Sequence, residues 1–197
     1  MTPILSALVG NNADLFPRIL ELYVKPGSVI ADVTWGKGAF WSKIDTTKYD
    51  LRATDLLTGT DFRQLPYADH SLDALVLDPP YLHGGDTVHP KIDACYNNGS
   101  VERGHESVVR LYCAGILEAT RVLKKKTGIL ILKCQDDNDG GNQRYTHMEM
   151  ISLMEMLGFR ILDLFVLMTT SQPMMRYDYQ LSARKNHSYF LVGKFRR

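Results

Sequence analysis

Four consecutive residues, Asp78-Pro79-Pro80-Tyr81, combine an acid, a rigid backbone and an aromatic ring directly after an apolar run. Two successive prolines fix φ twice and cannot donate ladder hydrogen bonds, so the chain must leave a sheet along a stiff, extended path. The tetrad therefore holds a carboxylate, a backbone carbonyl and a ring in a fixed relation. A planar base that carries an amino group requires these three groups.

The chemistry that suits this tetrad is the activation of an exocyclic amine. Such an amine on adenine or cytosine is a poor nucleophile, because its lone pair is delocalised into the ring. The Asp78 carboxylate and the Pro79 carbonyl would each accept one amine proton and draw the nitrogen toward a nucleophilic geometry, while Tyr81 would stack on the base. Catalysis of this kind is mostly positioning and electrostatic stabilisation. We therefore predict a catalytic loop formed by Asp78, Pro79, Pro80 and Tyr81.

A second candidate site follows an earlier apolar run that ends on Asp32, where Thr34 and Trp35 lead into Gly36 and Gly38. Glycine permits positive φ and lets the backbone approach a ligand closely, and the helix start that follows offers unpaired amides. A glycine pair after a strand also occurs as a simple tight turn, and both interpretations stay open here. The dinucleotide signature G-x-G-x-x-G is excluded, because Trp41 occupies its last position.

Asp55 ends the next apolar-to-acid run, at a position where a carboxylate can accept both hydroxyls of a ribose. It could equally cap a helix. Asp61 and Phe62 would supply an acceptor for an adenine amino group and an apolar face, or else form a capped turn. Together these residues favour an adenosine-containing cofactor, and we expect it to be covered by Phe16 and Pro17.

The elements that must position these residues follow from hydrophobic periodicity. The pattern predicts an α/β fold with a mostly parallel, doubly wound sheet and an antiparallel last strand. In such a sheet, ligands bind beyond the carboxyl ends of the strands. We expect Asp14 to cap the first helix and Pro17 to be tolerated only in its first turn. The predicted strands are residues 28–33, 50–55, 72–78, 128–133, 159–168 and 188–195, the predicted helices are 13–24, 40–44, 105–126 and 145–157, and long loops span 82–104 and 169–187.

Composition limits the class of protein. The chain has 197 residues, 45% of them hydrophobic, which suits one domain over residues 1–197. The formal net charge of +1 excludes a globally basic surface, so a polyanion would be held by a local patch. Three widely spaced cysteines and the lack of a leader or an apolar span indicate a cytoplasmic protein. His83, His89 and His105 fit no established ligand spacing, so we expect no metal.

The run from Leu65 to Tyr81, together with the pattern Asp32-x-x-x-Gly36-x-Gly38, resembles the amino-methyltransferase branch of the class I S-adenosylmethionine-dependent family. The resemblance is to DNA N6-adenine and N4-cytosine methylases, and Val33-Thr34-Trp35 replaces their usual Pro-Phe. It implies S-adenosylmethionine as the cofactor and a Rossmann-like domain. In that family an initial Asp in the tetrad goes mainly with adenine, so the resemblance implies methylation of adenine N6 in DNA.

The chain departs from larger members of that family because no segment is long enough to be a target-recognition domain. Recognition must then lie in the two long loops or come from a partner, or else the enzyme is promiscuous. A homodimer could grip duplex DNA. Basic and aromatic residues that alternate in these loops suit a flipped base. Two other functions stay open: an RNA amino-methyltransferase, and a non-catalytic subunit of a modification complex. The predicted nucleic-acid contacts are His83, His89, Lys91, Arg176, Arg184, Lys185, Asn186 and His187.

Overall fold

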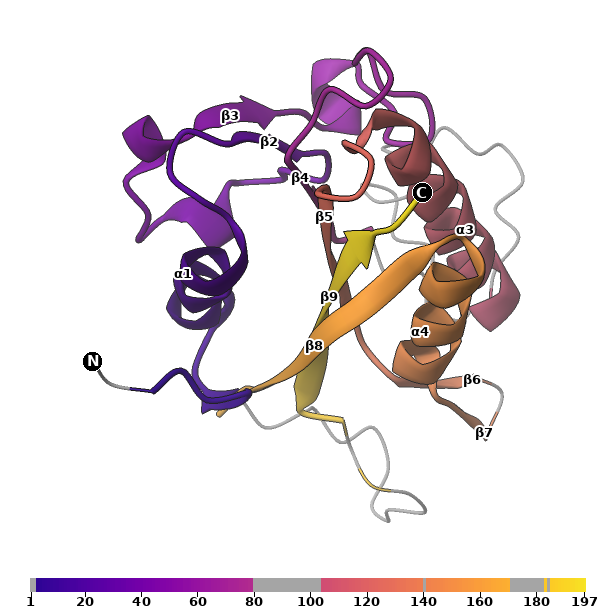
Figure 1. The fold of residues 1–197 in the computed structure, drawn as a ribbon. Helices are drawn as coiled ribbons and strands as arrows, with labels where there is room; N and C mark the ends of the chain where they lie inside the picture. The colour runs from indigo at the N-terminus through magenta and orange to yellow at the C-terminus, as the bar shows by residue number, and fades with distance from the viewer. Residues whose placement is uncertain (1–2, 80–103, 140, 171–182, 184) are drawn as a thin grey trace.

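The computed structural model describes residues 3–79, 104–139, 141–170, 183 and 185–197. Seven strands form one sheet in the order β1-β8-β9-β5-β4-β2-β3 (Figure 1). Strand β9 runs antiparallel to both of its neighbours, and the other pairs are parallel. This arrangement confirms the predicted fold class. The strands are β1 Ala7–Val9, β2 Val29–Asp32, β3 Asp50–Ala53, β4 Ala74–Leu77, β5 Ile129–Cys134, β8 Phe159–Met168 and β9 His187–Phe195.

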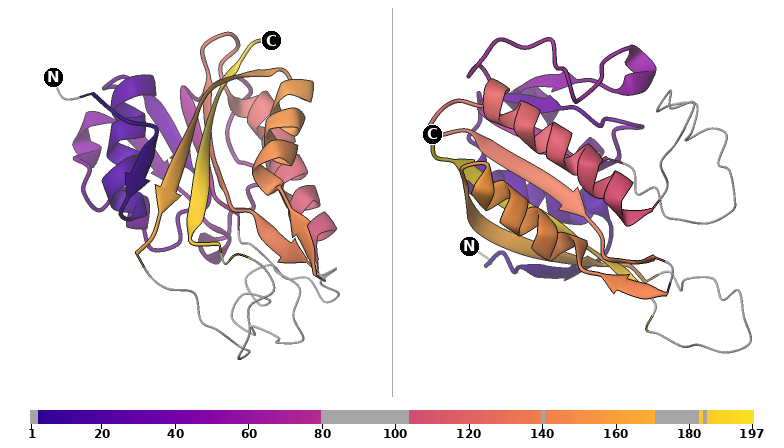
Figure 2. Two further views of the ribbon diagram at one scale, coloured as in Figure 1. Left: turned by 90° about the horizontal axis from the view of Figure 1, so that it is seen from below. Right: turned by 90° about the vertical axis from the view of Figure 1, so that its right-hand side faces the viewer.

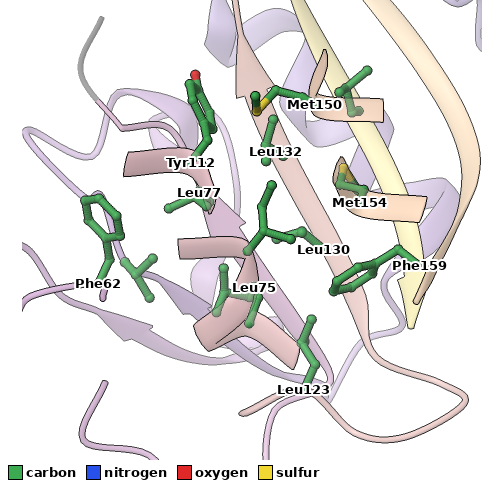
Figure 3. Packing of buried hydrophobic residues seen from close by; sticks show 14 of the residues in the cluster. Phe62, Leu75, Leu77, Tyr112, Leu123, Leu130, Leu132, Met150, Met154 and Phe159 are labelled. Carbon is green, nitrogen blue, oxygen red and sulfur yellow. The ribbon is translucent and has the colours of Figure 1, made fainter. Parts of the chain in front are cut away.

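Helices cover both faces of the sheet because its central strands are apolar on both sides. Helices α3 (His105–Val122) and α4 (Thr146–Met156) lie on one face, and α1 (Asn12–Tyr23) lies on the other (Figure 2). Successive residues of a strand point to opposite faces. Leu75, Leu77, Leu130 and Leu132 accordingly pack with α3 and α4 (Figure 3). Val76 and Ile131 pack with α1 on the opposite face.

Helix α1 begins one residue earlier than predicted. Asn11, not Asp14, is its N-cap, and the Asp14 carboxylate accepts the Asn11 N–H at 3.0 Å. Pro17 lies inside the helix and beyond the first turn, which corrects the second expectation. A proline there costs about 3 kcal/mol. Burial of Leu15, Phe16 and neighbouring apolar side chains, at about 1.5–3 kcal/mol each, exceeds that cost.

The other differences concern short elements. The predicted helix at 40–44 is the 3-10 helix η1 (Ala39–Trp41), and two further 3-10 helices are η2 (Thr46–Lys48) and η3 (Leu56–Thr58). Helix α3 ends at Val122, because the Lys124 N–H donates to Leu72 O at the sheet instead. The predicted break at 135–143 contains a hairpin of β6 (Asp137–Asp139) and β7 (Asn142–Arg144). That hairpin and the edge strand β1 were not predicted, because neither shows strand-like apolar alternation.

None of the helices in the described part of the chain is long and apolar enough to cross a membrane.

Candidate active site

The sheet reverses its order between β2 and β4. The chain runs from β2 outward to β3 and then returns to the other side of β2 to form β4. At such a switch point the loops that follow the two strands diverge and leave a crevice, where open α/β sheets bind ligands. Asp32 ends β2, and Asp78 follows β4 directly. The two predicted loops therefore begin side by side at this switch point.

Asp32 organises the first loop from inside the protein. Its side chain is buried, with 3% of the residue exposed, and it accepts the Trp41 indole N–H at 2.7 Å and the Thr34 N–H at 3.1 Å. Burial raises the pKa of Asp32 to about 6, and the nearby charges of Asp78 and Asp55 add to the shift. The side-chain carboxylates of Asp55 and Asp78 thus lie close enough to Asp32 to affect its pKa.

Thr34 connects the two loops. Its Oγ1 accepts the backbone N–H of Asp78 at 2.8 Å. Val33 N–H also donates to Val76 O at 3.2 Å, which continues the β2–β4 pairing past the end of β2. The start of the tetrad is therefore held in register with the first loop by hydrogen bonds that do not depend on a ligand.

Gly36 and Gly38 both adopt positive φ, at 54° and 67°. A Cβ on Gly38 would lie 2.6 Å from Trp35 Cζ2, so this position needs glycine for space as well as for backbone conformation. The Gly36 N–H donates to Asp55 Oδ2 at 2.9 Å, and Asp55 Oδ1 accepts the Leu57 N–H at 2.9 Å. Asp55 caps η3 as the alternative interpretation held, and it also links the glycine turn to the end of β3. A carboxylate has about four lone-pair positions, so these two bonds leave it capacity to accept others.

The remaining predicted cofactor residues differ in how deeply they are buried. Asp61 forms a bidentate ion pair with Arg63, whose Nη2 lies 2.7 Å from Oδ2. The Phe62 ring is buried against Gly115 of α3. Phe16 has no exposed surface and packs against Phe40 and Trp41, with ring centroids 5.2 and 5.1 Å away. Its connection to the first loop runs through Trp41 and Asp32, and Pro17 is half-buried beside it.

Lys133 is a site residue that was not predicted. It lies on β5, beside β4, and is 8% exposed; its Nζ lies 3.3 Å from Asp78 Oδ2. The same Nζ lies 5.7 Å from the ring centroid of Phe40 and 6.0 Å from that of Phe190. A buried lysine is costly unless it is paired. The signal was present in the sequence as a single cation inside the apolar run Ile129–Cys134.

A pocket of about 400 Å³ opens at the same edge of the sheet. It brings three of the predicted nucleic-acid contacts, Lys185, Asn186 and His187, together with Lys133. The described residues that line it include two lysines and no acid. They come from the start of α1, the ends of β5 and β8, and the start of β9: Asn11, Asn12, Lys133, Gln135, Leu167, Thr169, Lys185, Asn186, His187 and Ser188.

Seven predicted site residues lie outside the described residues: Pro80, Tyr81, His83, His89, Lys91, Arg176 and Arg184. Of the predicted catalytic loop, the structure places Asp78 and the buried Pro79. Within the described ranges, no three His, Cys, Asp or Glu side chains gather in a way that could hold a metal ion. Cys134 is buried in the core, which raises the pKa of its thiol.

No protein-family model matches the chain, and no curated protein matches it. Solved structures do share its fold. A SAM-dependent methyltransferase from Methanosarcina mazei is 14% identical with a TM-score of 0.55, over 90% of this chain and 97% of the other. A protein from Bacillus halodurans C-125 described as a methyltransferase is 13% identical with a TM-score of 0.57, over 93% of this chain and 100% of the other.

The [4+2]-cyclase SpnF is also similar, at 14% identity and a TM-score of 0.53, over 93% of this chain and 81% of the other. Likeness at these identities shows a common fold, the Rossmann-like methyltransferase fold. Since a cyclase shares it, the reaction has to be argued from the residues of the site.

Proposed function

We propose that this chain transfers a methyl group from S-adenosylmethionine to the N6 amino group of adenine in DNA. The observation that carries the proposal is the hydrogen bond from the Asp78 N–H to Thr34 Oγ1, at 2.8 Å. It joins the loop suited to a cofactor to the loop suited to an amine, at the switch point of the sheet. A methyl donor and a methyl acceptor must meet at such a junction.

The residues of the first loop fit this cofactor. The positive-φ turn at Gly36 and Gly38 would let the backbone approach the nucleoside, and Asp55 would accept hydrogen bonds from the ribose hydroxyls. Asp61 would lie toward the adenine and Pro17 would help to cover the site, while the buried rings of Phe62 and Phe16 would support them from the core. The cluster of Asp32, Asp55 and Asp78 favours a cationic ligand such as a sulfonium. The bound cofactor would supply an electrophilic methyl group.

The residues of the second loop would prepare the amine. The Asp78 carboxylate and the Pro79 carbonyl would each accept one amine proton, and Tyr81 would stack on the base. Lys133, at 3.3 Å from Asp78 Oδ2, would fix the direction of that carboxylate. A carboxylate held in advance costs little reorganisation when charge develops on the nitrogen.

The pocket that Lys133 connects to Asp78 would receive the nucleotide that carries the amine. Its two lysines suit a polyanion held by a local patch, as a net charge of +1 requires. The DNA strand would contact Lys185, Asn186 and His187 in this pocket. The loop residues His83, His89, Lys91, Arg176 and Arg184 would extend these contacts.

The test is transfer of tritium from labelled S-adenosylmethionine to unmethylated DNA, with ribosomal and transfer RNA in parallel. We expect label in DNA, loss of label with Asp78→Ala, and full label with Asp50→Ala, which removes an exposed acid at the start of β3. Label in RNA alone would overturn the assignment of DNA. Transfer that survives Asp78→Ala would overturn the assignment of the tetrad.

A further inference from the structure

Four polar side chains form a connected network next to the pocket. They come from three segments: Asp136 follows β5, His147 lies in the first turn of α4, and His187 and Tyr189 lie on β9. Asp136 Oδ1 lies 2.7 Å from His147 Nδ1, Asp136 Oδ2 lies 3.3 Å from the Tyr189 hydroxyl, and that hydroxyl lies 3.0 Å from His187 Nε2. His187 also lines the pocket. The network therefore runs from α4 to the pocket wall.

The direction of each hydrogen bond follows from which groups carry protons. An ionised carboxylate only accepts, so the Tyr189 hydroxyl donates its single proton to Asp136 and His147 donates through Nδ1. The His147 backbone N–H donates to the same Oδ1 at 3.2 Å. Because the Tyr189 proton is committed to Asp136, its oxygen accepts from His187, which must donate through Nε2. A neutral imidazole that donates through Nε2 accepts through Nδ1.

The central ring of the network is tightly held. Tyr189 stacks on His147 with ring centroids 4.3 Å apart and meets the edge of His187 at 5.3 Å and 89°. Asp136 is 5% exposed. Burial raises the pKa of Tyr189 to about 12, and Asp136 adds to the shift, so the hydroxyl keeps its proton at neutral pH. These contacts restrict both the tautomer and the plane of the His187 ring.

We infer that Tyr189, Asp136 and His147 are positioning residues that hold His187 as a hydrogen-bond acceptor for a base edge of the bound nucleic acid. The inference rests on the proposed function and deepens it. Phosphate oxygens only accept, so Nδ1 of a neutral His187 cannot bind them and must pair with an N–H of a base. Lys185 lines the same pocket and would supply donors for phosphate, while Lys133 is paired with Asp78. The pocket wall thus combines donors for the backbone with one oriented acceptor for a base.

The first experiment measures the tautomer of His187. Nitrogen–proton correlation spectra of the imidazoles should show His187 with its proton on Nε2. The spectra are recorded at pH 8, about 1.5 units above the ordinary pKa of His. Tyr189→Phe keeps the ring stack and removes the hydroxyl, and it should return His187 to a mixture of tautomers. The matched control is Tyr23→Phe, which removes another partly buried tyrosine–aspartate bond, 2.8 Å to Asp163. A mixture already present in the wild type, or no change on Tyr189→Phe, would overturn the network.

The second experiment measures oligonucleotide affinity by fluorescence anisotropy at pH 8, with a strand that carries bases and an abasic strand of equal length. Tyr189→Phe and His187→Ala should each raise Kd for the base-carrying strand about fivefold, the worth of one hydrogen bond. The abasic strand should bind unchanged, and Tyr23→Phe should change neither. The double variant should bind no more weakly than His187→Ala, because Tyr189 acts through His187.

The outcomes separate this inference from the proposed function. Additive single effects, or equal weakening for the abasic strand, would overturn the role of His187 as a base contact. A wild-type protein that binds neither strand would overturn it as well. If the expected affinities hold but no methyl transfer is detected, the proposed reaction fails and the base contact stands.

Discussion

Thr34 and Asp78 are 44 positions apart in the chain, yet one hydrogen bond of 2.8 Å joins them. Thr34 is half-buried, and its hydroxyl oxygen accepts this bond from the Asp78 backbone. The bond restricts the backbone of Asp78, whose carboxylate would accept an amine proton in the proposed reaction. At the residue scale, the proposed activity depends more on this constraint than on any single charge.

Thr34→Val tests that constraint. The substitution keeps the shape and removes the acceptor, so the Asp78 N–H loses its partner at a cost of about 1–3 kcal/mol. We expect kcat to fall about tenfold while the protein stays folded. Thr34→Ser restores the hydroxyl and should recover most of the rate. A valine variant with wild-type steady-state kinetics would show that the link is dispensable.

Asp32 provides a prediction about pH. Because burial raises its pKa to about 6 from 3.8, the folded protein binds the Asp32 proton more tightly than the unfolded chain does. The resulting stability is complete below pH 3.8 and is lost as pH rises through 6. Relative to Asp32→Asn, which does not titrate, the wild type should therefore lose about 1 kcal/mol of unfolding free energy between pH 5 and pH 7.5. Urea denaturation of both proteins measures this, and a constant difference or a gain would contradict it.

Residue types and spacing predicted which acids end the strands, but not how side chains pair. Asp32, Asp55 and Asp78 were found by their place after apolar runs, and the structure brings their loops to one edge. Lys133 was missed because its partner comes from a neighbouring strand, and strand order is not visible in a local pattern. Asp136 and Tyr189 were missed for the same reason, since they are connected only after β5 and β9 pair.

At the element scale, one arginine holds the segment before β4 against α3. The Arg121 guanidinium donates to Leu65 O and Tyr67 O, both at 2.9 Å, and it pairs with Asp69 and Glu118. These acids raise the pKa of Arg121 above its ordinary value. The Arg121 guanidinium thus holds the segment that precedes β4 and the tetrad against α3.

Arg121→Lys should destabilise the protein by about 1–3 kcal/mol, because a point-like ammonium cannot serve both carbonyls and leaves one without its donor. Arg110→Lys is the matched control: it lies on the same helix, and its side chain is 58% exposed with Glu106 3.9 Å away. We expect the control to change the unfolding free energy by less than about 0.5 kcal/mol. If urea denaturation gave equal losses of unfolding free energy for Arg121→Lys and Arg110→Lys, the hydrogen bonds of the Arg121 guanidinium would not stabilise the protein.

Elements with a strong apolar pattern were predicted well, and polar or very short ones were not. The run Phe159–Met168 is a strand with the predicted bounds, and both buried helices after residue 104 were found within a few residues. The hairpin of β6 and β7 is polar and is stabilised by backbone pairing, which leaves no periodic signal. Strand β1 has only three residues and gains its order from parallel pairing with β8.

At the scale of the whole molecule, the sheet order explains why distant loops form one site. The reversal between β2 and β4 brings together the cofactor loop and the tetrad, and β9 adds the pocket wall from the far end of the chain. Other proteins use the same fold, including a methyltransferase and a cyclase. The proposed reaction therefore depends on the side chains at the switch point and not on the architecture.

The central claim is that Asp78 activates an exocyclic amine for methylation. The most direct measurement is mass spectrometry of nucleosides from unmethylated DNA incubated with the protein and S-adenosylmethionine. We expect N6-methyladenine with the wild type and none with Asp78→Ala. The absence of any methylated nucleoside with the folded wild type, or undiminished N6-methyladenine with Asp78→Ala, would contradict it.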